Sequence, residues 1–547
     1  MTNPVDLRIE GMTCDHCEQS VARALERAGL QEVEADFRRG QARGEVGPGY
    51  SEERAASALE DAGYRLAGTF EEEQPSESPD GHDYEYDLLV LGAGSAAFAA
   101  AIKARELGAR VALVERGTVG GTCVNVGCVP SKALLRPAEL FWTVGHHQFP
   151  GMHLQADRVE LSELVVQKDE LVGVLRKEKY EDLIDVYGFE VIDGEARFTG
   201  PDKVEIEGRP VAAAHYLVAT GAAPWAPPIP GLEETGYLTS TTALELTELP
   251  AELIVVGANA IGLELGQYFL HLGSRVTFVE VLDRIAPFEE PEISAALHEH
   301  LLSQGAEVLA AAKVSQAGRA GQRVWLDVET DGEVRRLEAD RLLVATGRRA
   351  QTAGLGLEAA GVETDPRAHV VVDDEMATSN PRVWAAGDVT TAPQFVYVAA
   401  LQANIAAENA FRSAGRKIDY RTVPRVTFTA PTVASVGLTE AQAREAGRPV
   451  MTSVLPLDAV PRALVNRETT GLVKLVADES NGELLGAHIL AEGAGEVIQA
   501  AVMAMKYRAT VDEIGDTFHP YLTMAEGLKL AAQGFRKDVK TLSCCAA

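Results

Sequence analysis

The spacing of apolar residues divides the chain into segments of strand and helix character. After a short alternating run at the amino terminus, alternation at residues 33–37 and 42–46 predicts strands, and helical spacing around 21–28 and 52–62 predicts helices. The order β-α-β-β-α-β fits a split βαβ sandwich. Residues 71–81 are acidic and rich in proline and serine, a composition that cannot bury a core. We expect this stretch to be a linker.

A sequence repeat follows the linker. Residues 90–115 and 255–280 are equal in length, and both read as a buried strand, a glycine turn, a helix and a second strand that ends in glutamate. Each is followed by Ala-Thr-Gly, at 219–221 and at 345–347. Two such units predict two Rossmann-like nucleotide-binding domains in an α/β chain. From about residue 421 no glycine pattern recurs, and mixed strands and helices predict a separate α+β domain.

Composition limits the classes of function. The chain has 547 residues, with 50 Lys and Arg against 81 Asp and Glu, a formal net charge of −31. This charge opposes sequence-independent binding to DNA or anionic membranes, which needs clustered basic residues. The sequence has no apolar run of membrane-spanning length, and its amino terminus lacks the apolar core of a signal peptide. We expect a cytoplasmic protein that binds neither nucleic acid nor membrane.

The first glycine turn has the pattern of a dinucleotide-binding site. In Gly92-x-Gly94-x-x-Ala97, the first glycine makes a tight turn after a buried strand, and the second lets the backbone approach a pyrophosphate. Ala97 is small enough for helix and strand to pack closely. Glu115 ends the next strand, where a carboxylate holds ribose hydroxyls.

The second turn carries the information on the nicotinamide cofactor. It reads Gly257-x-Asn259-x-x-Gly262, and asparagine in place of the usual glycine tolerates left-handed backbone better than most residues. The acid that follows is Glu280, which accepts a hydrogen bond from a ribose 2′-hydroxyl and repels a 2′-phosphate. This favours NADH over NADPH, a preference that Arg284 would soften.

The cysteines occur as three close pairs: Cys14 and Cys17, Cys123 and Cys128, and Cys544 and Cys545. In a long chain, paired thiols indicate redox or metal chemistry rather than a disulfide scaffold. Cys123 and Cys128 lie in Gly-Gly-Thr-Cys-Val-Asn-Val-Gly-Cys-Val-Pro-Ser-Lys and can close a disulfide at the entry of a helix. Pro130 favours a helix start there, and the helix N-terminus should lower the pKa of Cys128.

The two outer pairs suit a soft metal ion. Structural zinc usually takes four ligands, whereas the two thiolates of Cys14 and Cys17 suit an ion of low coordination number such as Cu(I) or Hg(II). Adjacent cysteines such as Cys544 and Cys545 rarely form an unstrained disulfide, but they can present two sulfurs to a thiophilic ion. The segment around Gly11-Met12-Thr13-Cys14 and the pattern after it resemble a heavy-metal-associated domain.

Together these motifs resemble the pyridine nucleotide–disulfide oxidoreductase family over residues 86–535. The likeness is carried by the Cys123/Cys128 segment, both glycine turns, both Ala-Thr-Gly strands and Ala-Gly-Asp at 386–388. It implies FAD at the first glycine turn, NAD(P)H at the second, and a homodimer whose carboxy-terminal domain completes the partner's active site. It also implies that Cys128 contacts the flavin and that Cys123 meets the substrate.

The resemblance implies cofactor contacts from the following positions: Gly92, Gly94, Ala97, Glu115, Gly121, Thr122, Lys132, Ala196, Thr220, Gly257, Gly262, Glu264, Glu280, Gly347 and Asp388. Among them, Lys132 and Glu264 are expected beside the flavin. The Asp388 position is expected to hold the ribityl chain, and the Ala196 backbone to touch the adenine half of FAD.

The expected organisation has six parts. They are a ferredoxin-like heavy-metal-associated domain (1–68), an acidic linker (69–85), an FAD-binding domain (86–225 and 350–420), an NAD(P)-binding domain (226–349), a dimerisation domain (421–535) and a cysteine-containing tail (536–547).

Within the family, the three cysteine pairs resemble the members that reduce Hg(II) to elemental mercury in detoxification. This implies Hg(II) arriving as a thiol complex, all six cysteines as metal ligands, and Cys123, Cys128, Tyr521, Cys544 and Cys545 as catalytic residues. We expect the tail pair to capture the ion and the Cys123/Cys128 pair to receive it.

Two other functions stay open on sequence alone. Disulfide-reducing members pair a histidine with a glutamate five residues later as acid–base catalyst, and here Met524 stands at that position after His519. The missing acid favours a metal substrate. The retained histidine keeps dihydrolipoamide dehydrogenase or a low-molecular-weight disulfide reductase as the alternative. A metal-binding chaperone with a vestigial flavin domain is a further, weaker alternative.

Overall fold

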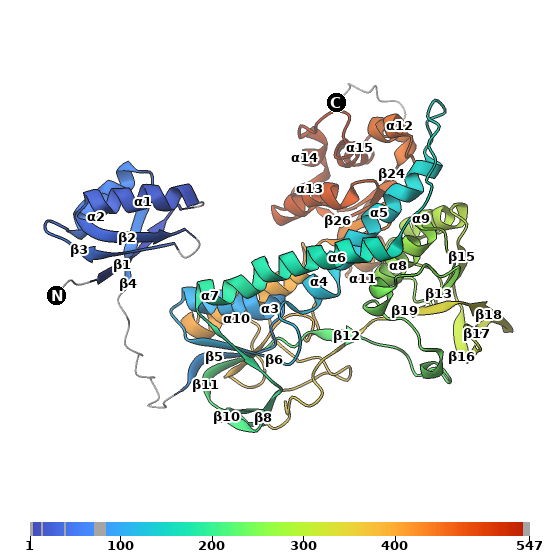
Figure 1. Ribbon diagram of the computed structural model, residues 1–547. Helices are drawn as coiled ribbons and strands as arrows, with labels where there is room; N and C mark the ends of the chain where they lie inside the picture. The colour runs from blue at the N-terminus through green and yellow to red at the C-terminus, as the bar shows by residue number, and fades with distance from the viewer. Residues whose placement is uncertain (1–3, 13–14, 38–39, 71–83, 540–547) are drawn as a thin grey trace.

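The computed structural model describes residues 4–12, 15–37, 40–70 and 84–539 (Figure 1). Its amino-terminal unit is an antiparallel sheet in the order β2-β3-β1-β4, with α1 (Asp15–Arg27) and α2 (Glu52–Asp61) packed on it. The strands are β1 (Pro4–Glu10), β2 (Leu30–Asp36), β3 (Gln41–Val46) and β4 (Arg65–Phe70). Leu7, Leu25 and Leu59 are fully buried between the layers. The predicted split βαβ order is confirmed.

The first nucleotide-binding unit is a parallel sheet in the order β21-β11-β5-β6-β7. Its strands are β5 (Tyr86–Leu91), β6 (Val111–Glu115), β7 (Glu190–Asp193), β11 (Ala213–Val218) and β21 (Val383–Ala385). In β5, Leu88 and Val90 pack against α3 (Ser95–Glu106) and α10 (Val396–Arg412). Leu89 and Leu91 face the meander of β8 (Ala196–Gly200), β9 (Lys203–Ile206) and β10 (Arg209–Val211). Both faces are covered, which explains the unbroken apolar run.

The second unit repeats this plan. Its parallel sheet has the order β15-β14-β13-β19, formed by β13 (Glu252–Val256), β14 (Arg275–Val279), β15 (Glu307–Leu309) and β19 (Arg341–Val344). In β13, Leu253 and Val255 pack against α8 (Ala260–His271) and α9 (Pro291–Ser303). Ile254 and Val256 face the meander of β16 (Lys313–Ala320), β17 (Arg323–Thr330) and β18 (Glu333–Ala339).

The carboxy-terminal unit is an antiparallel sheet in the order β22-β23-β26-β25-β24. The strands are β22 (Arg425–Thr427), β23 (Thr432–Gly437), β24 (Val450–Pro456), β25 (Leu472–Asp478) and β26 (Leu484–Ala491). All residues of the central strand β26 are buried. The helices α13 (Ala494–Lys506), α14 (Val511–Asp516) and α15 (Glu526–Gln533) contribute to its core.

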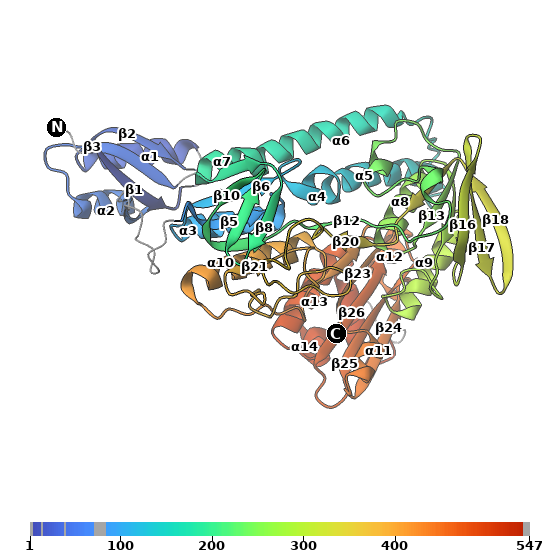
Figure 2. The ribbon, with the colours of Figure 1, turned by 90° about the horizontal axis from the view of Figure 1, so that it is seen from below.

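Two long helices join the nucleotide-binding units. Helix α5 (Cys128–His146) leaves the cysteine loop and packs on α8, and α6 (Leu161–Arg176) runs along both units (Figure 2). The buried Lys168 of α6 donates to the carbonyl of Leu244 at 3.2 Å and pairs with Glu245 at 2.7 Å, in the segment before β13. Helix α6 continues through a π-helical turn (Lys177–Glu181) into α7 (Asp182–Tyr187). Among the described residues, no helix is both long and apolar enough to cross a membrane.

We expect Gly262→Ala to destabilise the protein because a Cβ at Gly262 would lie 1.8 Å from the carbonyl oxygen of Gly257. Overpacking of this kind costs about 1–3 kcal/mol, so calorimetry should show a lower Tm for the unit that unfolds with this sheet. The matched control is Gly173→Ala in α6, where a Cβ meets no atom within 4 Å. That change should leave Tm unchanged or raise it, and equal Tm values for the two variants would contradict the packing argument.

Candidate functional site

A single cavity of about 1890 Å³ joins both nucleotide-binding units and the carboxy-terminal sheet around the cysteine loop. It brings together most of the residues that sequence reasoning assigned to cofactors: Gly92, Gly94, Glu115, Gly121, Thr122, Lys132, Ala196, Thr220, Gly257, Glu264, Glu280, Gly347 and Asp388. Cys123 and Cys128 line it too. Ala97 is fully buried behind the first turn, and Gly262 contacts Gly257, so both act through packing rather than by lining the cavity.

The two glycine turns are held by the same close approach. A Cβ at Gly92 (φ +115°) would lie 2.5 Å from the carbonyl oxygen of Ala219, and one at Gly257 (φ +98°) would lie 2.5 Å from that of Ala345. Only glycine fits a left-handed backbone this close to a neighbouring carbonyl. The middle residue of the second turn differs from our expectation. Asn259 has φ −110° and is extended, so its tolerance of left-handed backbone is not needed there.

A third glycine, Gly121, packs directly against the first glycine turn. Gly121 has φ +62°, and a Cβ on it would lie 2.7 Å from the Cα atom of Gly94. The cysteine loop and the first glycine turn therefore touch through bare backbone. This leaves a cradle at the start of α3 that suits a pyrophosphate, because backbone N–H groups at a helix N-terminus bind anions.

The two terminal glutamates anchor the turns. Glu115 Oε2 accepts from the Ala93 N–H at 2.8 Å, and Glu280 Oε2 accepts from the Ala258 N–H at 2.8 Å. The other oxygen of Glu280 accepts from the Leu282 N–H at 3.0 Å, and the side chain is 6% exposed. Each carboxylate therefore fixes its glycine turn while it faces the cavity. The acid at the end of the strand has a structural task in addition to the ribose contact expected of it.

The central thiols lie where two helices meet. Cys123 lies in α4 (Gly121–Asn125), and Cys128 is the first residue of α5. The Cys123 thiol donates a hydrogen bond to the Cys128 sulfur, and with the positive charge of Lys132 this lowers the pKa of Cys128 to about 6 despite burial. The same hydrogen bond raises the pKa of Cys123. The low pKa of Cys128 is as expected, but its largest cause is the partner thiol and not the helix N-terminus predicted from the sequence.

Lys132 is held by residues distant in sequence. Its Nζ lies 2.7 Å from Glu264 Oε2 and 4.4 Å from the ring centroid of Phe428. The other oxygen of Glu264 accepts from the Phe428 N–H at 2.8 Å. The side chain of Lys132 on α5 is therefore tied to α8 and to the carboxy-terminal unit. The pair keeps a fixed positive charge beside Cys128 that the carboxylate partly balances.

Asp388 and Arg348 give an independent sign of a polar ligand. Burial raises the pKa of Asp388, and Arg348 Nε lies 3.9 Å from its Oδ2. That Nε is buried and makes no hydrogen bond within the described part of the chain. Buried donors normally have an acceptor, so a polar group in the cavity would satisfy it. The glycine cradle, the acids and this donor together fit a dinucleotide such as FAD.

Tyr180 was not singled out from the sequence. It lies in the π-helical turn after α6, where its hydroxyl is 3.0 Å from Ser95 Oγ and its ring packs edge-on to Phe98 at 4.9 Å. Burial raises the pKa of Tyr180, and negative charge on the Cys123 and Cys128 sulfurs adds to the shift. Nothing in the linear pattern marks this tyrosine, because its closeness to the thiols depends on packing of α6 over α4.

The structure does not bring every expected residue together. Cys14, Cys544 and Cys545 lie outside the described residues. Cys17 is buried in the core of the amino-terminal unit, and the described residues form no cluster of three metal-ligating side chains. Tyr521 is 52% exposed and does not line the cavity within the described chain, while His519 Nδ1 contacts the Thr517 carbonyl at 3.0 Å.

Comparisons with known proteins agree with this geometry. Residues 86–403 match the model of the pyridine nucleotide-disulphide oxidoreductase family, and residues 423–532 match its dimerisation domain. A mercuric reductase of Staphylococcus aureus is 50% identical over 100% of this chain and 99% of its own length. One of Streptomyces lividans is 51% identical over 84% of this chain and 98% of its own.

Solved structures agree as well. The Cu(II) complex of an HOCl-induced flavoprotein disulfide reductase of Escherichia coli has a TM-score of 0.75 at 31% identity, covering 83% of this chain and 100% of its own.

We expect the low pKa of Cys128 to depend on a hydrogen-bond donor at position 123. Cys123→Ser keeps a hydroxyl donor. The rate at which iodoacetamide alkylates Cys128 should therefore fall to half its maximum only when the pH falls to about 6. In Cys123→Ala the donor is lost, and the midpoint should rise by about one unit or more toward that of an ordinary thiol. Mass spectrometry of the Cys128 peptide gives the rates. Identical midpoints in the two variants would contradict the assignment.

Proposed function

The chain belongs to the pyridine nucleotide-disulphide oxidoreductase family, and from this premise we propose that it reduces Hg(II) to elemental mercury. The observation that carries the proposal is the placement of Cys123, Cys128 and Lys132 together in the cavity that both nucleotide units share, where the neighbouring thiol and the lysine lower the pKa of Cys128 to about 6. A thiolate is the form of cysteine that binds soft metal ions. The reaction balances as Hg(II) + NAD(P)H giving Hg(0) + NAD(P)⁺ + H⁺.

The cavity residues have distinct tasks in this reaction. Bound FAD would supply the transfer of two electrons from NAD(P)H to the site of the two thiols. Gly92, Gly94 and Gly121 would hold its pyrophosphate, and Asp388 would hold its ribityl chain. The Cys128 thiolate needs no separate base to take Hg(II) from a thiol complex, because its pKa is already about 6.

We propose that Hg(II) reaches the inner pair by thiol exchange. Cys544 and Cys545 of the partner subunit remove the ion from its thiol carrier, and Cys123 and Cys128 then displace them one sulfur at a time. Each exchange replaces one metal–sulfur bond by another, so no free ion is released. In the amino-terminal unit, Cys14 and Cys17 collect Hg(II) for the tail. Tyr521 of the partner subunit and Tyr180 are proposed to lie beside the ion during transfer.

The acid–base pair that a disulfide reductase needs is incomplete. Met524 packs against the carboxy-terminal core where those enzymes carry a glutamate, so His519 lacks that carboxylate partner. Oxidation of a dithiol requires an oriented proton acceptor, whereas transfer of two electrons to a metal ion does not. Dihydrolipoamide dehydrogenase or a low-molecular-weight disulfide reductase is therefore the second candidate, supported by His519 and by the likeness to a solved flavoprotein disulfide reductase.

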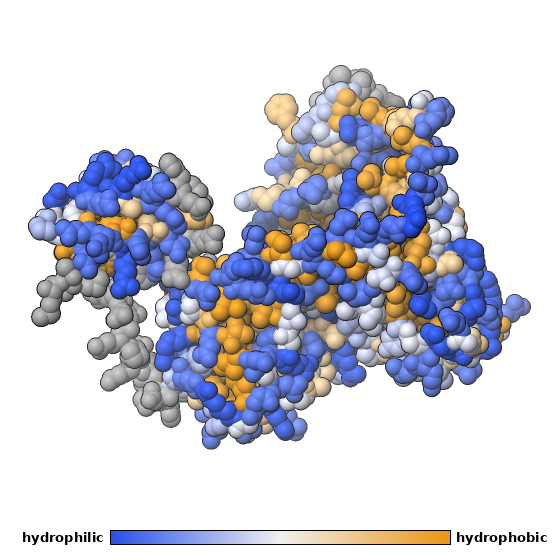
Figure 3. All heavy atoms as spheres, viewed as in Figure 1, coloured by the Kyte–Doolittle hydropathy of each residue, from blue (hydrophilic) through white to orange (hydrophobic). Residues whose placement is uncertain are grey.

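We propose a homodimer built on the carboxy-terminal unit. Apolar residues gather on this unit in Figure 3, and Phe518, Tyr507 and Met503 are exposed there. Exposed apolar surface of this kind marks an interface, and residues 423–532 match a dimerisation domain. In such a dimer we expect Tyr521, Cys544 and Cys545 to act at the partner's cavity. We also propose that the chain has the six domains and segments expected from the sequence.

We propose NADH as the preferred donor. Glu280 faces the cavity and is fixed by two backbone N–H groups, so it cannot turn away from a 2′-phosphate. Arg284 donates to the Pro287 carbonyl at 2.9 Å, which directs one of its nitrogens into its own loop. We also propose that the reaction takes place in the cytoplasm, because its donor is a reduced nicotinamide nucleotide.

The purified flavoprotein should oxidise NADH when given HgCl₂ with excess thiol, and should use lipoamide or glutathione disulfide poorly. Loss of absorbance at 340 nm measures turnover, and release of mercury vapour identifies the product. NADPH in place of NADH serves as the donor control and should give a lower kcat/KM. Brisk turnover of a disulfide with no reduction of Hg(II) would assign the chain to the second candidate.

Replacing both Cys544 and Cys545 by Ala should cripple turnover of thiol-bound Hg(II) while flavin reduction by NADH keeps its rate. The expected loss in kcat/KM is about two orders of magnitude, because the ion must then exchange directly from bulk thiol. Stopped-flow absorbance separates the two steps, and Cys128→Ser provides a variant in which reduction of Hg(II) fails with the tail intact. Full activity of the double variant would refute the relay.

A further inference from the structure

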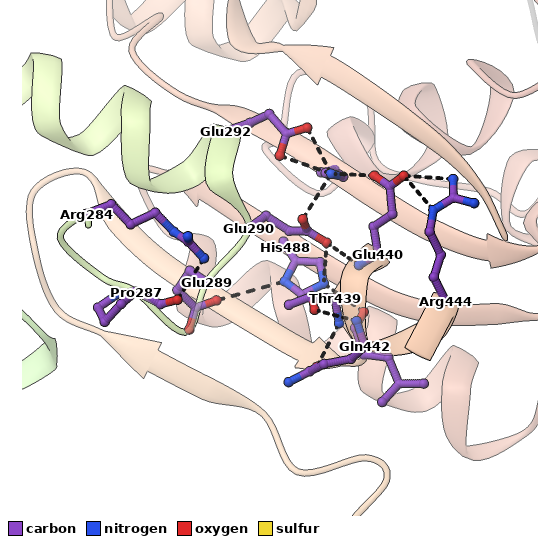
Figure 4. A network of polar contacts seen from close by, with 12 residues as sticks. Arg284, Pro287, Glu289, Glu290, Glu292, Thr439, Glu440, Gln442, Arg444 and His488 are labelled. Atoms are coloured by element: carbon purple, nitrogen blue, oxygen red, sulfur yellow. Dashed lines mark hydrogen bonds and ion pairs between the residues drawn. The ribbon is translucent and has the colours of Figure 1, made fainter. Parts of the chain in front are cut away.

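A buried ion cluster lies between the second nucleotide-binding unit and the carboxy-terminal sheet (Figure 4). Lys474 of β25 is 1% exposed, and its Nζ lies 3.0 Å from Glu290 and 2.9 Å from Glu292 at the start of α9. Its third partner is Glu440, 3.1 Å away, which begins α11 (Glu440–Glu445). One lysine therefore joins three carboxylates from two units of the fold.

A histidine and an arginine extend the cluster. His488 of β26 is fully buried, donates from Nε2 to the Leu438 carbonyl at 3.0 Å, and lies 3.8 Å from Glu290 Oε1. Its Nδ1 lies 3.9 Å from Glu289 Oε2, and Arg425 Nε lies 3.5 Å from the other oxygen of Glu289. Lys474 thus joins Glu290 to the carboxy-terminal sheet by a hydrogen bond, whereas His488 and Arg425 face Glu289 at the longer distances of an ion pair, as Figure 4 shows for His488.

Stability alone does not explain such a cluster. Removing charges from water costs about as much as a buried ion pair returns, so well-packed apolar residues would serve the core equally well. What ion pairs provide is fixed geometry between the groups they join. The geometry fixed here is that of Glu289 and Glu290, which end the loop that begins after Glu280.

That loop, residues 281–290, forms one wall of the cavity. Val281, Leu282, Pro287 and Phe288 line it, and Phe288 is 65% exposed. Within the loop, the Ala286 N–H donates to the Ala258 carbonyl at 2.8 Å, next to the second glycine turn. The loop is thus held at its start by Glu280, at its middle by the glycine turn, and at its end by the ion cluster.

We propose that Lys474 and His488 are positioning residues for the nicotinamide nucleotide. They hold loop 281–290 so that Pro287 and Phe288 present an apolar edge to the adenine ring while Glu280 meets the adjoining ribose. Through this loop, the carboxy-terminal sheet sets the affinity of the second glycine turn for its nucleotide. This inference rests on the proposed assignment of NAD(P)H to that turn.

The test uses titration calorimetry of the full-length flavoprotein with NAD⁺ and with 5′-AMP. We expect Lys474→Met to raise the Kd of both ligands by about tenfold, because both contain the adenosine half that the loop receives. Unchanged flavin absorbance verifies that the first nucleotide site is intact. The matched control is Arg448→Met, which breaks an ion pair of 2.7 Å with the buried Asp478 in the same sheet without touching the loop. Its Kd values should equal those of the unaltered protein.

A second, milder variant keeps the inference testable if Lys474→Met fails to fold. His488→Gln keeps an amide donor for Leu438 but removes the ring that faces Glu289 and Glu290, and should raise both Kd values about threefold. Unchanged Kd values in a folded variant overturn the inference, as does weakened NAD⁺ with unaltered 5′-AMP binding. No mercury is present, so the result stands apart from the Hg(II) assay. An unaltered protein that binds neither ligand would overturn the nucleotide assignment and this inference with it.

Discussion

A hydrogen bond between two sulfur atoms is the interaction on which the chemistry of this protein depends. The Cys123 thiol donates to Cys128 and, with Lys132, holds the pKa of Cys128 near 6. Lys132 is in turn fixed by Glu264, at 2.7 Å, from the second nucleotide-binding unit. Phe428 of the carboxy-terminal unit contacts both partners of that pair. Three units of the fold thus converge on the lysine that lies beside this thiolate.

The two nucleotide-binding units form their glycine turns by the same close packing. Each places a glycine under a carbonyl of the neighbouring Ala-Thr-Gly segment, and each ties its turn to a glutamate at the end of the next strand. Their difference lies in what surrounds the turn. The first is closed by the cysteine loop through Gly121, and the second by loop 281–290 with its ion cluster. The repeat supplies two equivalent cradles, and the flanking segments distinguish their ligands.

Ion pairs between units are placed where position matters more than stability. Lys132 with Glu264, Lys168 with Glu245, and Lys474 with Glu290 each cross a boundary between elements far apart in the chain. Each gains little net stability from burial. Each also fixes the spacing of two elements that line or support the cavity, which a purely apolar contact defines less sharply.

The sequence by itself determined the elements and most of the residues that line the shared cavity. Period-two and helical patterns located the strands and helices, the repeat revealed two nucleotide units, and residue type alone marked the glycine turns and thiol pairs. Tertiary structure decided the rest: the cause of the low Cys128 pKa, the closeness of Tyr180 to the thiols, and the ion pair between Lys474 and Glu290. These depend on contacts between residues distant along the chain. Local patterns encode which face of an element is buried, but not which distant side chain it meets.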